Sequence, residues 1–127
     1  MLTPHQKNQL RDLAQQYGWR LLVLFGSVAR GEDGGDVDLG IMPAASPGVM
    51  TQARWQRELE AIVDPKPVDM VILYPGTSPL TRFQVLWNGL CLFEARQGVF
   101  EHEQNRAFFL QADAQLWEQH QAEVSDG

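Results

Sequence analysis

The sequence predicts an α/β fold in a single domain over residues 1–127. Short apolar runs typical of buried strands alternate with longer segments whose apolar residues recur at helical spacing. Three pairs, Thr3-Pro4, Ser46-Pro47 and Ser78-Pro79, predict helix starts, because each offers an N-cap residue followed by proline at the first helical position. We therefore expect helices and strands to alternate around one hydrophobic core.

The first helix is expected over residues 4–17, and a buried strand follows it. Thr3 and Gln6 match a capping box at the helix start, and Gly18 provides the stop. The apolar residues on one side of this helix are Leu10, Leu13, Ala14 and Tyr17. The next segment, Leu21–Phe25, is a continuous apolar run, which is typical of a strand covered on both faces.

A glycine-rich segment follows this strand. Gly26 permits a sharp turn and a close approach of the backbone to a ligand. The residues from Ser27 to Arg30 are expected to form the first turn of a helix, whose unpaired N–H groups suit a phosphate. The Ser27 hydroxyl adds a further donor. Arg30 is expected either to contact phosphate or to pair with Glu32 or Asp33.

Two aspartates stand at the start of the next apolar run. Asp36 and Asp38 alternate with Val37, Leu39 and Ile41. Because side chains alternate between the two faces of a strand, both carboxylates should project from one face while the apolar side chains face the core. Neighbouring carboxylates repel each other unless a cation lies between them, and Mg²⁺ is usually held by one or two carboxylates plus substrate phosphates. Asp36 and Asp38 are therefore candidate magnesium ligands.

The second main helix is expected over residues 47–63 and should end before Pro65. Its apolar face comprises Trp55, Leu59, Ile62 and Val63. The run over residues 68–73 predicts another strand, in which Asp69 is the single acid. An aspartate within an apolar strand is costly to bury unless it is paired or binds a metal. Asp69 is therefore the candidate third ligand, and Asp64, in an expected turn, is the weaker alternative.

The last third of the chain predicts two helices and one strand. A helix over residues 79–88 should stop at Gly89, and the apolar run over residues 90–93 predicts a short strand. The core is expected to end at about residue 95, and a C-terminal helix is expected over about residues 98–121. The apolar residues at helical spacing in this last helix are Phe100, Ala107, Leu110, Ala114 and Trp117.

The C-terminal helix carries more aromatic side chains than one face can hold. Phe108 and Phe109 should point about 100° apart, and Leu116 and Trp117 pose the same problem. The helix is expected either to lie between two packed layers or to present Phe108, Phe109 and Trp117 as a protein interface, where aromatic residues are enriched.

The order Gly26-Ser27, Asp36-x-Asp38 and a later Asp69 resembles the nucleotidyltransferase superfamily that includes DNA polymerase beta. In its Gly-Ser-x-Ala-Arg-Gly-Glu motif and its short length, the chain resembles the minimal nucleotidyltransferases (MNT) of that superfamily in particular. Members of that group are often antitoxins paired with a HEPN-domain ribonuclease toxin. The resemblance covers about residues 1–95 and implies a small mixed β-sheet flanked by helices. In that sheet the Gly-Ser strand and the Asp-x-Asp strand are antiparallel neighbours.

The resemblance also implies an activity, the transfer of AMP from ATP. The nucleotide phosphates would bind at Gly26 and Ser27, with Arg30 as a further contact. Asp36, Asp38 and Asp69 would hold two Mg²⁺ ions, and Asp69 would also orient the attacking hydroxyl or accept its proton. The implied acceptor is a tyrosine of a HEPN ribonuclease toxin, which the added AMP silences.

Two alternatives stay open at the level of sequence. The loop from Val28 to Gly35 is shorter than in most members of this group, although Gly34-Gly35 would let a tight loop close. A protein that keeps the fold but neutralises its partner by contact alone is therefore one alternative. The other is a nucleotidyltransferase that acts on a small molecule with help from another subunit.

Composition limits the partners and the compartment. A net charge of −6 argues against non-specific nucleic-acid binding, which needs clustered Lys and Arg. The single cysteine, Cys91, permits no internal disulfide and indicates a reducing compartment. We expect a cytoplasmic protein, since no apolar run approaches the roughly 20 residues of a membrane span and no signal region opens the chain.

Overall fold

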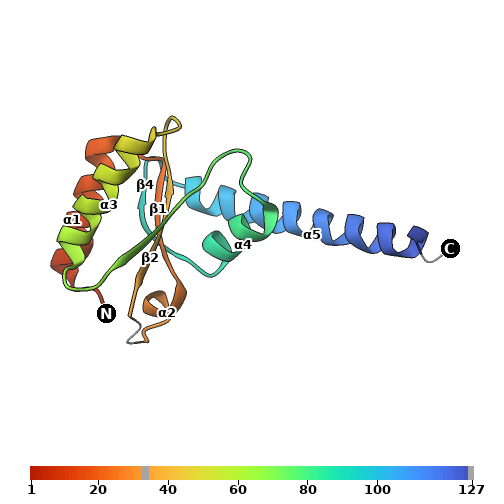
Figure 1. Cartoon of the computed structure of the whole chain (residues 1–127), viewed down its shortest axis with the longest axis horizontal. Helices are drawn as coiled ribbons and strands as arrows, with labels where there is room; N and C mark the ends of the chain where they lie inside the picture. Colours follow the sequence, from red (N-terminus) through yellow and green to blue (C-terminus); the bar gives the residue numbers. More distant parts are fainter. Residues whose placement is uncertain (33–34, 126–127) are drawn as a thin grey trace.

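Helices and strands alternate along the chain, as the sequence predicts. The computed structural model describes residues 1–32 and 35–125. The elements are α1 (Pro4–Tyr17), β1 (Leu21–Phe25), α2 (Gly26–Ala29), β2 (Val37–Met42), α3 (Val49–Val63), β3 (Val68–Ile72), α4 (Pro79–Trp87), β4 (Leu90–Glu94) and α5 (Val99–Ser125). Helices cover both sides of one sheet (Figure 1), which confirms the α/β class.

The four strands form a mixed sheet in the order β3-β2-β1-β4. Strand β1 is antiparallel to both β2 and β4, whereas β2 and β3 are parallel. A parallel pair needs a crossover connection, and α3 supplies it. The mixed sheet and the antiparallel pairing of β1 with β2, both implied by the resemblance, are therefore confirmed. The register places Asp38 opposite Phe25 on one side and opposite Asp69 on the other.

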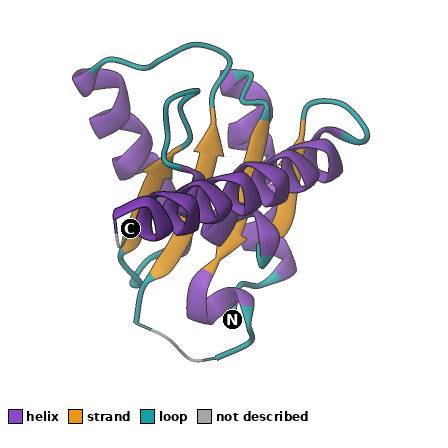
Figure 2. Ribbon diagram, turned by 90° about the vertical axis from the view of Figure 1, so that its right-hand side faces the viewer, coloured by secondary structure: helices purple, strands orange, loops and turns teal. Residues whose placement is uncertain are grey.

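A separate hydrophobic core lies on each face of the sheet. Helices α1 and α3 cover one face, and α4 and the first part of α5 cover the other (Figures 1 and 2). Val37, Leu39 and Ile41 belong to the core beneath α1 and α3, as the alternation predicts. Gly40 faces α4, because a Cβ atom built there would lie 2.5 Å from Val85 Cγ1. Residues of β2 that alternate with the apolar set, Asp38 among them, therefore face the α4 side.

Two of the three expected helix starts are confirmed. The Thr3 side chain accepts the Gln6 N–H in a complete capping box, and Ser78 accepts the Thr81 N–H. The expected start at Ser46-Pro47 is wrong, because α3 begins at Val49 with Gly48 as its N-cap.

The physical reason for the later start of α3 lies in the loop that precedes it. The Pro47 carbonyl accepts a hydrogen bond from the Gln52 side chain, at 3.2 Å. It does not accept the first backbone hydrogen bond of the helix. The first backbone bond of α3 runs from Gln52 N–H to the Gly48 carbonyl, at 3.0 Å. Pro47 therefore belongs to the loop between β2 and α3.

Helix α5 is longer than expected and only partly packed. It continues to Ser125, beyond the expected end at residue 121. Ala107 is fully buried against the α4 side, whereas Leu110 and Trp117, which the sequence places on the same face, are exposed. Phe108 and Phe109 are exposed too, so the alternative of a helix between two packed layers is wrong. The second half of α5 projects away from the sheet (Figure 1).

Candidate active site

The residues of the glycine–serine and aspartate motifs meet at one end of the sheet. Strand β1 ends there at Phe25, and β2 and β3 both begin there. The parallel register places Asp38 beside Asp69, although they are separated in sequence by all of α3. Asp36 stands immediately before β2. The three aspartates singled out in the sequence are therefore brought to one place, whereas Asp64, the weaker candidate, is the C-cap residue of α3.

The pKa of the Asp38 carboxyl group is raised above its ordinary value. Burial raises its pKa, and the nearby carboxylates of Asp69 and Asp36 raise the pKa further. A side-chain hydrogen bond with Asp69 acts in the same direction, and only the Arg30 guanidinium opposes them. The ionised form of Asp38 is thus crowded by negative charge, and a bound cation would relieve this repulsion.

Gly26 fits against Asp38 so closely that no side chain can replace its hydrogen. Its φ is +74°, in the left-handed region that favours glycine. A Cβ atom built on Gly26 would lie 2.0 Å from Asp38 Oδ2. The turn after β1 therefore brings bare backbone against the carboxylate, and this explains in local terms why glycine precedes Ser27.

Ser27 lies in the short helix α2, directly after this turn. Its side chain is half-buried, and within residues 1–32 and 35–125 its hydroxyl has no hydrogen-bond partner. Arg30 pairs with Glu32, with 3.3 Å between Nε and Oε1, so this expected pairing is confirmed. The other expected pairing, with Asp33, lies outside the described residues, as does Gly34 of the tight loop.

A recess of about 320 Å³ opens beside Gly26. Its lining comprises Phe25, Gly26, Arg30, Gln84 and Asn88. Gln84 and Asn88, which α4 and its C-cap contribute, were not predicted as site residues from the sequence. The signal that was available is their spacing of four residues, which places two amide side chains on one side of a helix.

The carboxylates at this end of the sheet fit a magnesium ion that also binds substrate phosphates, and they do not surround the ion by themselves. In the part of the chain that the structure describes, no group of three or more His, Cys, Asp or Glu side chains is arranged to hold a metal by itself. Magnesium needs only one or two carboxylates when substrate phosphates supply the other oxygens. The paired Asp38 and Asp69, with Asp36 nearby, meet that requirement.

Comparison with known families supplies the deciding observation. The sequence profile described as "Polymerase beta, Nucleotidyltransferase" matches residues 8–98, which include the whole sheet and every aspartate of the site. The chain belongs to this nucleotidyltransferase family.

Solved structures share the fold of this nucleotidyltransferase over nearly its whole length. A toxin–antitoxin structure with AMP-PNP matches with a TM-score of 0.73 and 22% identity, covering 94% of this chain and 96% of the other. A tri-AMPylated Shewanella oneidensis HEPN toxin in complex with MNT antitoxin matches with a TM-score of 0.69 and 21% identity, covering 95% and 94%. The MntA–HepT toxin–antitoxin complex matches with a TM-score of 0.68 and 21% identity, covering 95% of each chain.

Two further findings are negative. No curated protein is significantly similar to this nucleotidyltransferase in sequence. Among the described residues, none of the helices combines the length and the apolar character that crossing a membrane requires.

Proposed function

We propose that this nucleotidyltransferase transfers AMP from Mg-ATP to a HEPN toxin and so acts as the antitoxin of a toxin–antitoxin pair. The observation that carries the proposal is the register of Asp38 with Asp69 at the end of the sheet where the recess beside Gly26 opens. The family and the fold support the reaction class. The structures with AMP-PNP and with an AMPylated HEPN toxin support the nucleotide and the acceptor.

In this proposal the turn after β1 binds the nucleotide phosphates. Gly26 lets the backbone approach them, and Ser27 donates its hydroxyl to a phosphate oxygen. Arg30 lies at the recess beside this turn, where its guanidinium suits a phosphate once it leaves Glu32. Gln84 and Asn88, which also line the recess, offer amide groups to the rest of the nucleotide.

The three aspartates would bind the metal and activate the acceptor hydroxyl. Asp36 and Asp38 would hold magnesium, with Asp69 as a further ligand. When bound, the metal neutralises phosphate charge and stabilises the entering and leaving oxygens of the displacement. Asp69 is exposed on the edge strand β3, so an acceptor hydroxyl can reach it from solvent. Its carboxylate would orient that hydroxyl and accept its proton as the hydroxyl oxygen bonds to the α-phosphorus of ATP. The bond between the α-phosphorus and the bridging oxygen of the β-phosphate breaks in the same step, and pyrophosphate leaves.

The test is transfer of label from α-labelled ATP to a purified HEPN partner in the presence of magnesium. Wild type should label the partner, and Asp38→Asn and Asp69→Asn should each lower the rate by about 100-fold or more, because both remove positioning groups. Asp12→Asn, at an exposed position of α1, is the charge-matched control and should label normally.

Neutralisation by contact alone is the second candidate, and the exposed aromatics of α5 favour it. In that case Asp38→Asn would inhibit the toxin as well as wild type does, and neither protein would label it. Label recovered on a small molecule instead of the partner would contradict the protein acceptor while leaving the reaction class intact.

A further inference from the structure

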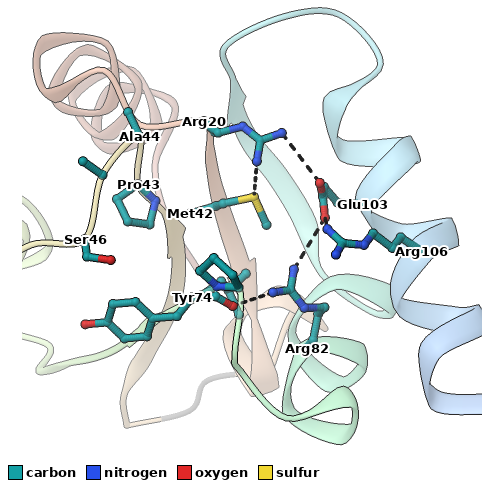
Figure 3. Close-up of a pocket in the computed structure, with 12 residues that line it drawn as sticks. Arg20, Met42, Pro43, Ala44, Ser46, Tyr74, Arg82, Glu103 and Arg106 are labelled. Carbon is teal, nitrogen blue, oxygen red and sulfur yellow. Dashed lines mark hydrogen bonds and ion pairs between the residues drawn. The ribbon is translucent and has the colours of Figure 1, made fainter. Parts of the chain in front are cut away.

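A second pocket lies at the opposite end of the sheet from the aspartates. It has a volume of about 270 Å³ and lies where β1 starts and where β2 and β3 end, next to α4 and α5 (Figure 3). Three arginines reach it from separate parts of the chain: Arg20 just before β1, Arg82 on α4 and Arg106 on α5. We call this site the arginine pocket.

The arginine pocket carries an excess of positive charge. Among the described residues that line it, Glu103 is the one carboxylate that faces the three guanidinium groups. One negative charge neutralises one guanidinium, so a formal charge of about +2 remains. This concentration of positive charge stands out in a chain whose net charge is −6.

Arg82 and Glu103 form the built floor of the arginine pocket. Each is only 3% exposed. Arg82 donates to the Tyr74 carbonyl and lies 3.5 Å from Glu103 Oε2 (Figure 3). Burial lowers the pKa of Arg82, and the positive charges of Arg106 and Arg20 lower it further, while Glu103 opposes them. Arg82 therefore shares its carboxylate partner, Glu103, with Arg20 and Arg106.

Arg20 and Arg106 are held only loosely in the absence of a ligand. Arg20 Nη2 lies 3.6 Å from Glu103 Oε1, and Arg106 Nη1 lies 3.9 Å from Glu103 Oε2. Charge-assisted hydrogen bonds are normally about 2.7–2.9 Å long, so these are weak pairs. The other partner of Arg20 is the Met42 sulfur, at 3.3 Å, and a thioether is a weak acceptor. The two side chains are 48% and 53% exposed, so both can turn toward a ligand.

We propose that the arginine pocket binds the phosphate group of a small molecule, or free phosphate, as a doubly charged oxyanion. A dianion supplies the two negative charges that Glu103 leaves missing. Guanidinium forks match phosphate oxygens in geometry, and the site offers donors from three directions. The enclosing loops, with Pro43, Tyr74 and Pro75, leave room for a small anion, whereas the net charge of −6 disfavours a polynucleotide.

The experiment is a titration of inorganic phosphate into the protein without magnesium or nucleotide, at constant ionic strength. Binding is measured by calorimetry and located by amide chemical shifts. Arg20→Gln and Arg106→Gln should each weaken phosphate binding about tenfold or more, because each removes a fork of donors from a half-exposed position. Arg57→Gln, on the exposed side of α3, is the matched control and should bind like wild type.

A parallel titration with glycerol 3-phosphate separates the two sources of the ligand. Tighter binding than that of inorganic phosphate assigns the pocket to a phosphomonoester, and equal or weaker binding assigns it to free phosphate. In both cases the amides of Ser46 and Tyr74 should shift while that of Ser27 does not. Asp38→Asn should bind phosphate normally, which separates this proposal from the proposed nucleotidyl transfer.

Two results would overturn the proposal. The first is phosphate affinity that is the same in Arg20→Gln, Arg106→Gln and wild type, which would leave the cluster as a structural ion-pair network. The second is a set of shifts confined to Gly26 and Ser27, which would place all phosphate binding at the other end of the sheet.

Discussion

Gly26 and Asp38 fit closely against each other at the aspartate end of the sheet. Two independent features require glycine at position 26. Its backbone is in the left-handed region, and a Cβ atom built there would lie 2.0 Å from Asp38 Oδ2. Motif residues in this protein are thus constrained by one another as well as by a ligand.

Gly26→Ala should therefore displace the Asp38 carboxylate and lower AMP transfer by about 100-fold or more, since misplacement by about 1 Å has that effect. Gly18→Ala is the matched control, because Gly18 has φ +66° but open space around its Cβ position. Left-handed strain should cost both variants about 1–2 kcal/mol in urea unfolding. Transfer that is equally slow in both variants would contradict the role assigned to the contact with Asp38.

Asp38→Asn should stabilise the metal-free protein at pH 7. Burial, Asp69 and Asp36 raise the pKa of Asp38 in the folded state, so its contribution to stability is present below its ordinary pKa of about 4. That contribution is lost as pH rises through the raised value, and the ionised group then lowers the free energy of unfolding. Urea titrations should give the variant a higher free energy of unfolding than wild type at pH 7. The difference between the two free energies should become smaller as the pH falls toward 4. A variant that is less stable at pH 7 would contradict this account.

At the scale of elements, capping signals in the sequence predicted a helix start correctly where a hydrogen bond within the same turn sets that start. Thr3 and Ser78 cap the helices that their sequences predict, and each accepts a hydrogen bond three residues away. Ser46-Pro47 carries the same signal but belongs to a loop, because Gln52 and the Gly48 carbonyl set the start of α3. The recess residues Gln84 and Asn88 could not be assigned for a related reason, since their neighbours lie on β1 and α2.

Thr3→Ala should lower the free energy of unfolding by about 1 kcal/mol, because it removes the side-chain acceptor of a capping box. Ser46→Ala should leave stability unchanged within about 0.5 kcal/mol, since Ser46 is exposed and caps nothing. Urea unfolding of both variants measures the difference. A loss of stability at Ser46 equal to that at Thr3 would contradict the observed start of α3.

At the scale of the whole molecule, α4 and α5 share a row of aromatic side chains, most of them exposed. Phe83 stacks on Trp87, Trp87 contacts Phe108, and Phe108 contacts Phe109, with ring centroids 5.2–5.7 Å apart. Trp117 continues the exposed apolar surface farther along α5. Sequence periodicity predicted the helix but could not show which of its faces the sheet would leave uncovered.

Phe109→Ala and Trp117→Ala should each weaken the complex with a HEPN partner about tenfold or more, if the proposed function holds, because exposed aromatics are frequent interface hot spots. Both side chains are about two-thirds exposed, at 65% and 64%, so the free energy of unfolding should hardly change. Met50→Ala, which removes an exposed apolar side chain from α3, is the control. Affinity that is unchanged in both α5 variants would place the interface elsewhere.

The four tryptophans give the molecule two separate optical reporters. Trp19 and Trp55 are buried in the core on the α1 and α3 side of the sheet, with ring centroids 5.0 Å apart, so their fluorescence changes when the core opens. Trp87 on α4 and Trp117 on α5 are 43% and 64% exposed, so both are accessible to a quencher such as iodide. A partner seated on α5 would shield only the second pair. Quenching experiments can therefore distinguish docking from unfolding in one unlabelled sample.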